Sequence, residues 1–231
     1  MFNKNWEFIY KKIAQDLNLE IDKDIFAADI LNKLLDDKKL VSLKDIRSII
    51  ENKEVIVFGA GPSLENSIIK NKKVISNKIK IAADGATTAL IKNNFQPDII
   101  VTDLDGKIKD QIKSNLNGSI VVIHAHGDNI DKINQHLYSF KENIIGTTQI
   151  NPQPFKNLHN FGGFTDGDRA IFFADFFNPK KIYLLGFDFN GEIGKYSFSD
   201  KKDKFLKLKK LKWCKYFINN LKKEKDIIQE L

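Results

Sequence analysis

Cysteine and histidine are scarce in this sequence. A single cysteine, Cys214, in 231 residues excludes an internal disulfide and any zinc site built on several cysteines. Four histidines are too few for a histidine-rich metal tract. If the protein binds a metal, carboxylates are therefore the expected ligands, and carboxylates favour a hard cation such as Mg²⁺.

Long apolar runs are also missing. No run reaches the roughly 18 residues that are needed to span a bilayer. Residues 1–16 mix aromatic and aliphatic side chains with lysine, asparagine and acids, which does not match a signal peptide. We therefore expect a cytoplasmic protein with no membrane partner.

The net charge of +7 is concentrated at one end of the chain. Residues 201–231 hold 11 lysines and 4 acids, whereas basic and acidic residues balance in the remainder. A solvated, lysine-laced helix explains this pattern, and a phosphate-attracting surface is the alternative. Because the larger part of the chain is neutral, we do not expect a nucleic acid as a partner.

Two patterns of hydrophobicity divide the chain. In residues 1–52, apolar side chains recur at three- and four-residue steps, which predicts helices and no strand. From residue 54, short continuous apolar runs alternate with helical stretches, which is typical of parallel strands that are buried on both faces. The expected strands are 55–58, 79–83, 99–102, 120–124, 144–147 and 182–185. The expected helices between them are 62–70, 86–93, 108–115, 129–140 and 168–177.

These patterns predict an α/β fold with a doubly wound, mostly parallel sheet. We expect a small helical subdomain over 1–52, a Rossmann-like nucleotide-binding catalytic domain over 53–200 and a basic helix over 201–231. Ligands of such sheets bind at the carboxyl ends of the strands, so the residues that follow each strand are the candidates for function.

Glycines follow the first expected strand. Gly59 and Gly61 let the backbone approach a ligand closely, and Pro62 and Ser63 suit a helix start, where free N–H groups bind anions. We expect this loop to bind the phosphates of ATP, although a tight turn alone explains it too. After the second strand, Asp84 and Gly85 are also candidates for ATP binding, and Asp84 for metal binding.

The third strand ends in the most informative segment of the chain. Asp103 and Asp105 stand two residues apart at the exit of a buried strand, where bare carboxylates repel each other. A divalent cation removes that conflict. We predict that Asp103 and Asp105 bind metal and act in catalysis, and that Gly106 permits a sharp turn after them. A helix cap plus one solvated acid is the structural alternative.

Further polar residues follow the later strands. Asp128 reaches the metal in our interpretation and joins Asp103 and Asp105 in catalysis, while His126 donates to a phosphate oxygen. Capping and packing are the alternatives for both residues. The remaining candidates bind the acceptor substrate, and they are Thr165, Asp166 and Asp188. A helix cap is the alternative for Thr165 and Asp166. Arg169 is the first candidate to offset charge on the leaving group.

The motifs together resemble a known family. Three segments resemble the nucleotide and metal motifs of thiamin pyrophosphokinases. They are Ala82–Ala86 (ADGA within it), residues 97–106 (PDIIVTDLDG) and residues 126–131 (HGDNID). With residues 59–64 (GAGPSL) and 162–169 (GFTDGDR within it), the chain is more similar to archaeal-type 6-hydroxymethyl-7,8-dihydropterin pyrophosphokinases. The resemblance covers about residues 55–189 and implies Mg²⁺-dependent transfer of diphosphate from ATP to a hydroxymethyl-pterin.

Three alternatives stay open at this point. A thiamin pyrophosphokinase-like enzyme would run the same chemistry on another acceptor. A dinucleotide-dependent oxidoreductase would use Asp84 for the ribose, although Leu64 replaces the third glycine of that fingerprint. A nucleotide or RNA binder would use the basic terminal helix. The oligomeric state is also open, with a homodimer as one option.

Overall fold

The computed structural model describes residues 4–197 and 204–231, and within them nine strands form one sheet in which all neighbours run parallel. The strand order is β1-β6-β5-β4-β3-β2-β8-β9, and β7 pairs with β6 off this path. The chain thus runs outward from β2 to β6 and then returns to the other side of β2. This reversal confirms a mostly parallel α/β sheet that is wound in two directions.

The strands and helices have the following bounds. The strands are β1 (Lys39–Leu40), β2 (Glu54–Phe58), β3 (Ile79–Ala83), β4 (Ile99–Thr102), β5 (Ile120–Ala125), β6 (Glu142–Thr148), β7 (Leu158–His159), β8 (Lys181–Leu185) and β9 (Ile228–Glu230). The helices are α1 (Lys4–Leu17), α2 (Ile21–Leu34), α3 (Leu43–Ile50), α4 (Leu64–Lys70), α5 (Lys72–Ser76), α6 (Ala86–Lys92), α7 (Ile108–Leu116), α8 (Ile130–His136), α9 (Asp166–Phe176) and α10 (Lys204–Glu224), with a short 3₁₀ helix at Leu137–Ser139.

Helices cover both faces of the sheet, because successive side chains of each strand point to opposite faces. In β2, Val55 and Val57 pack in one cluster with α3, α9 and α10, whereas Ile56 and Phe58 pack in another with α4, α5 and α6. Over β4, β5 and β6 the second face is covered by α2 and α8. Both faces are therefore apolar, which explains why the strands read as continuous apolar runs.

The terminal segments join the sheet, which the periodicity did not predict. β1 lies within residues 1–52 and pairs with β6, so the expectation of no strand in that segment is wrong. β9 follows α10 and pairs with β8, so the basic terminal segment is more than a helix. Two and three residues are too few to show a period, and their pairing partners lie far away in the sequence.

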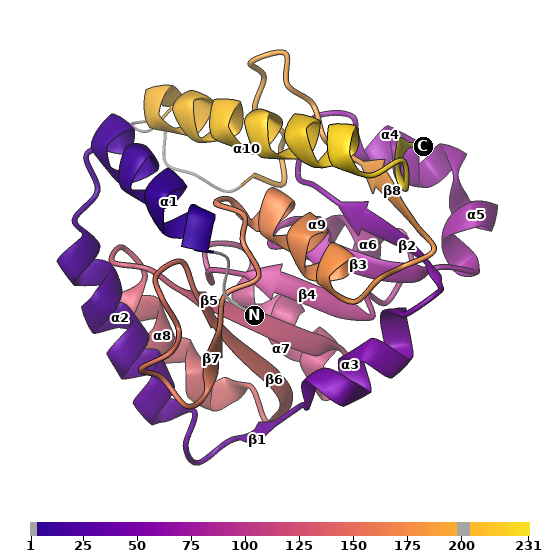
Figure 1. Ribbon diagram of the computed structural model, residues 1–231. Coiled ribbons are helices and arrows are strands. Elements are labelled where there is room, and N and C mark those ends of the chain that lie inside the picture. The colour runs from indigo at the N-terminus through magenta and orange to yellow at the C-terminus, as the bar shows by residue number, and fades with distance from the viewer. Residues whose placement is uncertain (1–3, 198–203) are drawn as a thin grey trace.

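The first and last helices pack against each other beside the sheet. Figure 1 shows α10 running next to α1 and across α9. Trp6 and Ile13 of α1 share a cluster with Phe164, at the start of α9, and with Phe217 of α10. Asp16 links the two helices, because it accepts hydrogen bonds from Trp213 Nε1 at 2.9 Å and from Lys209 Nζ at 3.3 Å. In the described part of the chain, none of the helices combines the length and apolar character that crossing a bilayer requires.

Candidate active site

A cavity of about 420 Å³ lies at the carboxyl ends of the central strands. Its floor comes from the residues that follow five strands, and its walls come from α1, α2, the start of α9 and the first half of α10. The residues at the strand ends are Gly59, Asp84, Asp103, His126 and Gly186. The pocket is thus where ligands of a doubly wound sheet are expected.

Three carboxylates meet in this pocket. Oxygen atoms of Asp84, Asp103 and Asp166 lie within 4.8 Å of one another. Asp84 follows β3, Asp103 follows the adjacent β4, and Asp166 opens α9, so three separate elements bring them together. The side chains of Asp103 and Asp166 are 15% and 14% exposed, so they reach the pocket but little bulk water.

One oxygen of Asp84 is fixed by three donors. Thr102 Oγ1, Gly106 N and Gln111 Nε2 donate to Oδ1 at 2.8, 3.0 and 2.8 Å. The second oxygen stays available to a ligand in the pocket. Gln111 lies on the buried face of α7 and is itself fully buried, so its amide group contacts Asp84 and not the solvent.

Gly106 is required by the close approach of this carboxylate. A Cβ at position 106 would lie 2.6 Å from Asp84 Oδ2 and 2.8 Å from Oδ1. Gly106 has no positive φ, whereas Asp84 and Leu104 have φ values of 40° and 67°. The sharp turn that we expected at Gly106 is thus made at Leu104, and the glycine leaves room for the acid.

His126 positions Asp103. The backbone N–H of Asp128 donates to His126 Nδ1 at 3.2 Å, which places the ring proton on Nε2. Nε2 lies 3.3 Å from Asp103 Oδ2, so the histidine donates to the carboxylate. Asn129, which is fully buried, ties the loops after β4 and β5 together, because its Nδ2 donates to the carbonyl oxygens of Asp103 and His124 at 2.8 and 2.7 Å.

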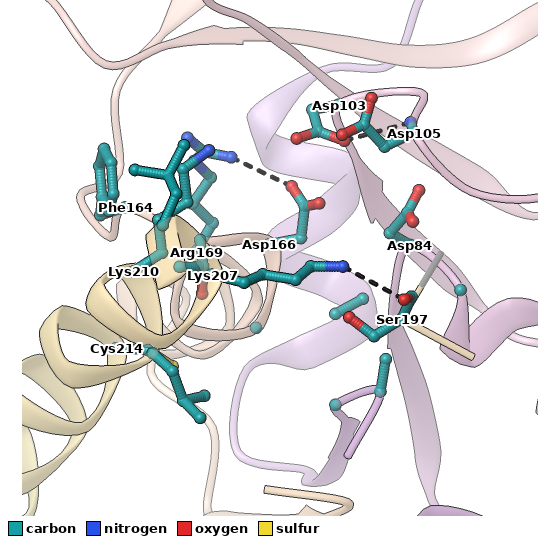
Figure 2. Close-up of a pocket in the computed structure, with 18 of the residues that line it drawn as sticks. Asp84, Asp103, Asp105, Phe164, Asp166, Arg169, Ser197, Lys207, Lys210 and Cys214 are labelled. Carbon is teal, nitrogen blue, oxygen red and sulfur yellow. Dashed lines mark hydrogen bonds and ion pairs between the residues drawn. The ribbon is translucent and has the colours of Figure 1, made fainter. Parts of the chain in front are cut away.

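Asp166 is paired with Arg169. Arg169 Nη1 donates to Asp166 Oδ1 at 3.1 Å, and Nη2 donates to Gln149 Oε1 at 3.1 Å. The arginine side chain is 8% exposed, so the guanidinium group is held inside the wall of the pocket. Figure 2 shows this pair beside Asp84 and Asp103.

The electrostatics of the three acids fit a bound cation. Burial, and then the charge of Asp103, raise the pKa of Asp84 to about 7, and the same two causes raise the pKa of Asp166 well above its ordinary value. Burial also acts to raise the pKa of Asp103, but the hydrogen bond from His126, with the charges of Arg169 and Lys210, outweighs it and holds this pKa below its ordinary value. Carboxylates that resist ionisation together become stable as anions when a divalent cation lies between them.

Two of the expected metal ligands lie outside this group of three. Asp105 faces Lys132, with which it forms an ion pair, and its side chain is 46% exposed. Asp128 is exposed, and its backbone N–H contacts His126. Both residues line the pocket, so their catalytic and metal roles stay predictions. The structure instead brings in Asp166, which the sequence pattern assigned to the acceptor.

The glycine loop lies at one end of the pocket, but its amides already have partners. Gly59 N donates to the Leu185 carbonyl at 2.8 Å, and Gly61 N donates to the Gly186 carbonyl at 2.9 Å. Ser63 N and Oγ donate to Asp188 Oδ2 at 2.9 and 2.8 Å. These three amides are therefore not free for phosphate. Asp188, which we expected to bind the acceptor, holds the loop, while Gly59, Gly61 and Gly85 still line the pocket.

Thr165 is engaged in a helix cap. Its hydroxyl and its backbone N–H both donate to Asp168 Oδ1, the latter at 2.8 Å, and the two residues form a capping box at the start of α9. Its side chain is therefore used locally, although the residue lines the pocket. The capping alternative that the sequence left open for Thr165 describes the observed contacts.

The opposite wall of the pocket is basic and was not predicted. Lys207 and Lys210 of α10 line it together with Leu211 and Cys214. A spacing of three, four and seven residues places these side chains on one face of a helix. The sequence offered a signal, since the excess of lysine at this end matched a phosphate-attracting surface, but it did not show which lysines face the pocket.

The N-terminal helices also contribute to the site, although the sequence indicated no functional residue in them. Tyr10 of α1 donates to Asp24 Oδ2 of α2 and accepts a hydrogen bond from Gln149 Nε2 at 2.7 Å. Asp24 Oδ1 accepts the Gly127 N–H at 2.8 Å. Through Gln149 this network reaches Arg169 and, through Arg169, the carboxylate of Asp166.

A parallel sheet that is wound in two directions, with a carboxylate-lined pocket at its carboxyl edge, defines a doubly wound α/β protein with a candidate ligand site at that edge. The comparison with known families specifies it further. The model of the family described as 6-hydroxymethylpterin diphosphokinase MptE-like matches residues 28–193, and the chain belongs to this family. The resemblance that the motifs indicated is thereby confirmed, and the protein is a transferase of the kinase type.

Three curated archaeal relatives carry the name 6-hydroxymethyl-7,8-dihydropterin pyrophosphokinase. The protein of Methanocaldococcus jannaschii is 43% identical over 97% of this chain and 97% of its own length. The Pyrococcus furiosus protein is 40% identical over 95% and 94%, and the Methanothermobacter thermautotrophicus protein is 39% identical over 96% and 96%. The similarity thus includes the terminal helices as well as the sheet.

Among solved structures, the MAf glycosyltransferase of Magnetospirillum magneticum aligns with a TM-score of 0.48 and 16% identity. The alignment covers 73% of this chain and 27% of that protein. This likeness is too distant to bear on function.

Proposed function

We propose that this protein transfers the β,γ-diphosphate of ATP to the hydroxymethyl group of 6-hydroxymethyl-7,8-dihydropterin, which gives AMP and the pterin diphosphate. The observation that carries the proposal is the convergence of Asp84, Asp103 and Asp166 at the carboxyl edge of the sheet. The names of the full-length relatives point to the same reaction. They favour a pterin over thiamin, which would otherwise suit the same phosphate chemistry.

The three acids are the proposed ligands of Mg²⁺. When bound, the cation would neutralise the negative charge on the phosphate oxygens, including the charge that is redistributed among them during the transfer. The contribution of the protein is to hold each carboxylate in place. Thr102, Gly106 and Gln111 fix one oxygen of Asp84, while His126 orients Asp103 and Arg169 orients Asp166. Such orientation of ligands by their neighbours supports metal affinity.

The strand order suggests where each substrate lies. Gly59 and Gly186 follow β2 and β8 on one side of the central acids, and His126 follows β5 on the other side. We place the nucleotide on the glycine side, where Gly59, Gly61 and Gly186 line the pocket without side chains. The acceptor then lies on the side of His126 and the turn between α1 and α2, where Leu17, Asn18 and Leu19 line the pocket.

The reaction itself balances without a further reactant. The hydroxymethyl oxygen bonds to the β-phosphorus, the bond from that phosphorus to the α,β-bridging oxygen breaks, and AMP leaves with the electron pair. The proton of the hydroxyl group is released. Such transfers depend on alignment and charge neutralisation more than on covalent catalysis. A pocket that holds its acids in fixed positions can therefore catalyse the reaction without a nucleophilic side chain.

The test is formation of AMP from ATP and Mg²⁺ in three parallel reactions, with the hydroxymethyl-dihydropterin, with thiamin and without an acceptor. We expect AMP and a diphosphate ester, detected by ³¹P NMR, only with the pterin. AMP formation with thiamin alone would transfer the assignment to the thiamin enzyme. A cytoplasmic location is part of the same proposal, since ATP is abundant there.

A further inference from the structure

We propose that Lys207 and Lys210 of α10 form a phosphate clamp, a pair of cations that binds the polyphosphate chain from the side opposite to the three acids. The proposal rests on the proposed function for the identity of the substrate, but its ligand class, a metal-bound polyphosphate, can be tested separately. It assigns a role to the basic terminal helix, of which only some lysines face the pocket.

The first observation is selective placement. α10 carries many lysines, but only Lys207 and Lys210 are among the residues that line the pocket in the described chain. Lys212 is exposed and does not line the pocket, and Lys209 contacts Asp16 of α1. The contacts of Asp16 with Lys209 and Trp213 hold α10 against α1, and with α10 in this place Lys207 and Lys210 form part of the pocket wall.

The second observation is the position of Lys207 in front of the acids, with which the electrostatics of the pocket agree. Burial lowers the pKa of Lys207, whereas the carboxylates of Asp105, Asp84 and Asp103 oppose that shift. Lys210 is in turn one of the cations that act to lower the pKa of Asp103. In Figure 2 the side chain of Lys207 extends from α10 into the space in front of the acids, where its ammonium group donates to the Ser197 carbonyl at 3.2 Å.

This arrangement matches a polyanion that carries a divalent cation. Acids on the floor of the pocket bind the cation, and the oxygens of the phosphates that point away from it need positive partners on the other wall. Arg169, our first candidate for this role, donates through Nη1 and Nη2 to Asp166 and Gln149 and so is engaged with the protein. Because Lys207 and Lys210 line the pocket on the side of α10, we assign to these two lysines the role that we first expected of Arg169.

The two lysines act at different places. Lys207 contacts Ser197, which lies with the glycine loop on the proposed nucleotide side, so it neutralises charge that develops on the leaving α-phosphate. Lys210 lines the pocket one helical turn further along α10, where Figure 2 shows it beside Arg169, and there it contacts the diphosphate that is transferred. Charge that grows on the leaving oxygen is stabilised most in the transition state, so loss of Lys207 should lower kcat more than it raises KM.

The experiment compares Lys207→Met, Lys210→Met and the exposed control Lys212→Met. Methionine retains an unbranched apolar stem and a high helix propensity, so the fold should persist, which thermal melting verifies. Isothermal titration with Mg²⁺ and inorganic tripolyphosphate measures binding without any acceptor. We expect Lys207→Met and Lys210→Met each to weaken this binding by about 10- to 100-fold and to lower kcat/KM similarly, with Lys212→Met within about twofold of the unmodified protein.

Lys207→Arg serves as the conservative variant, because it keeps the charge and should retain more activity than Lys207→Met. If a methionine variant binds tripolyphosphate as tightly as the unmodified protein does, the lysine that it replaces is not part of the clamp. The same result in both variants overturns the proposal. If the unmodified protein forms no AMP with the pterin, the proposed function fails, yet the titration still decides whether the lysine pair binds polyphosphate.

Discussion

Asp84 is held at one oxygen by three donors, and its carboxylate offers an oxygen that lies within 4.8 Å of oxygens of Asp103 and Asp166. Asp84 therefore contributes more to ligand binding than to the stability of the fold. Asp103 is constrained in a similar way by His126 and by the Asp105 N–H, which donates to Asp103 Oδ1 at 3.2 Å. At the scale of single residues, the site is therefore a set of acids whose orientation is fixed in advance.

Removing the charge of either acid should abolish most activity. We expect Asp84→Asn and Asp103→Asn each to lower kcat by about 100-fold or more, because the metal loses a ligand and the phosphates lose their neutralising partner. The steady-state rate of AMP formation is the measurement. Asp131→Asn, which changes an exposed acid at the start of α8, is the matched control and should keep the full rate. Full activity in Asp103→Asn would remove the carboxylate cluster from the mechanism.

The raised pKa of Asp84 predicts how metal binding depends on pH. Burial and the charge of Asp103 raise that pKa to about 7, so below this pH the carboxyl group holds a proton that the metal must displace. The affinity for Mg²⁺ should therefore increase as the pH rises toward 7, by about tenfold per unit, and level off above it. Titration of Mg²⁺ alone at pH 6 and pH 8 measures the difference. Equal affinities at the two values would show that Asp84 is ionised at both.

Among the elements, α1 and α2 act on the site through hydrogen bonds rather than through direct contact with the acids. Burial, with the charge of Asp24 next, raises the pKa of Tyr10, so the hydroxyl keeps its proton and donates it to Asp24. Tyr10 thereby connects α2 to Gln149, which in turn holds Arg169. The helices at the start of the chain are part of the framework of the site.

Tyr10→Phe should report this connection, because it removes one hydroxyl and preserves the ring that packs with Trp6. Leaving Asp24 Oδ2 and Gln149 Nε2 without the Tyr10 hydroxyl costs about 1–3 kcal/mol, which corresponds to a Tm lower by about 5 °C. We also expect kcat/KM to fall roughly tenfold as Arg169 loses its orientation. Tyr138→Phe, at a 66% exposed position, is the control. A lower Tm with unchanged kcat/KM would limit Tyr10 to a structural role.

At the scale of the whole molecule, the two ends of the chain close over the sheet. α1 and α10 pack together, β9 extends the sheet beside β8, and the pocket takes residues from almost every part of the chain between them. The site can therefore form only when the complete fold is assembled.

Cys214 offers a measure of that closure. The thiol is 3% exposed, and burial raises its pKa well above the ordinary value, so it should resist thiol reagents in the native protein. We expect labelling in urea to be at least a thousandfold faster than in buffer, in parallel with global unfolding followed by circular dichroism. Rapid labelling of the folded protein would instead show that α10 leaves the pocket without global unfolding.

The sequence by itself determined the sheet and where its ligands bind. Strands buried on both faces must be apolar throughout, so β2, β3, β4, β5, β6 and β8 are visible as continuous runs, and acids placed at their ends are visible against them. Asp84, Asp103 and the glycine loop were found in this way. The short strands β1 and β9 were not, because only their distant partners make them strands.

Tertiary structure decided which polar groups meet. Asp166 lies 63 residues beyond Asp103 in sequence, yet its oxygen reaches the same cluster because α9 begins at the carboxyl edge of β3 and β4. Likewise, Asp188 caps the glycine loop and Lys207 faces the acids only because loops and helices cross above the sheet. The periodicity of a sequence shows on which face of a strand or helix a side chain lies. Which charged groups interact depends on the distances between residues far apart in the sequence, and a local pattern does not contain those distances.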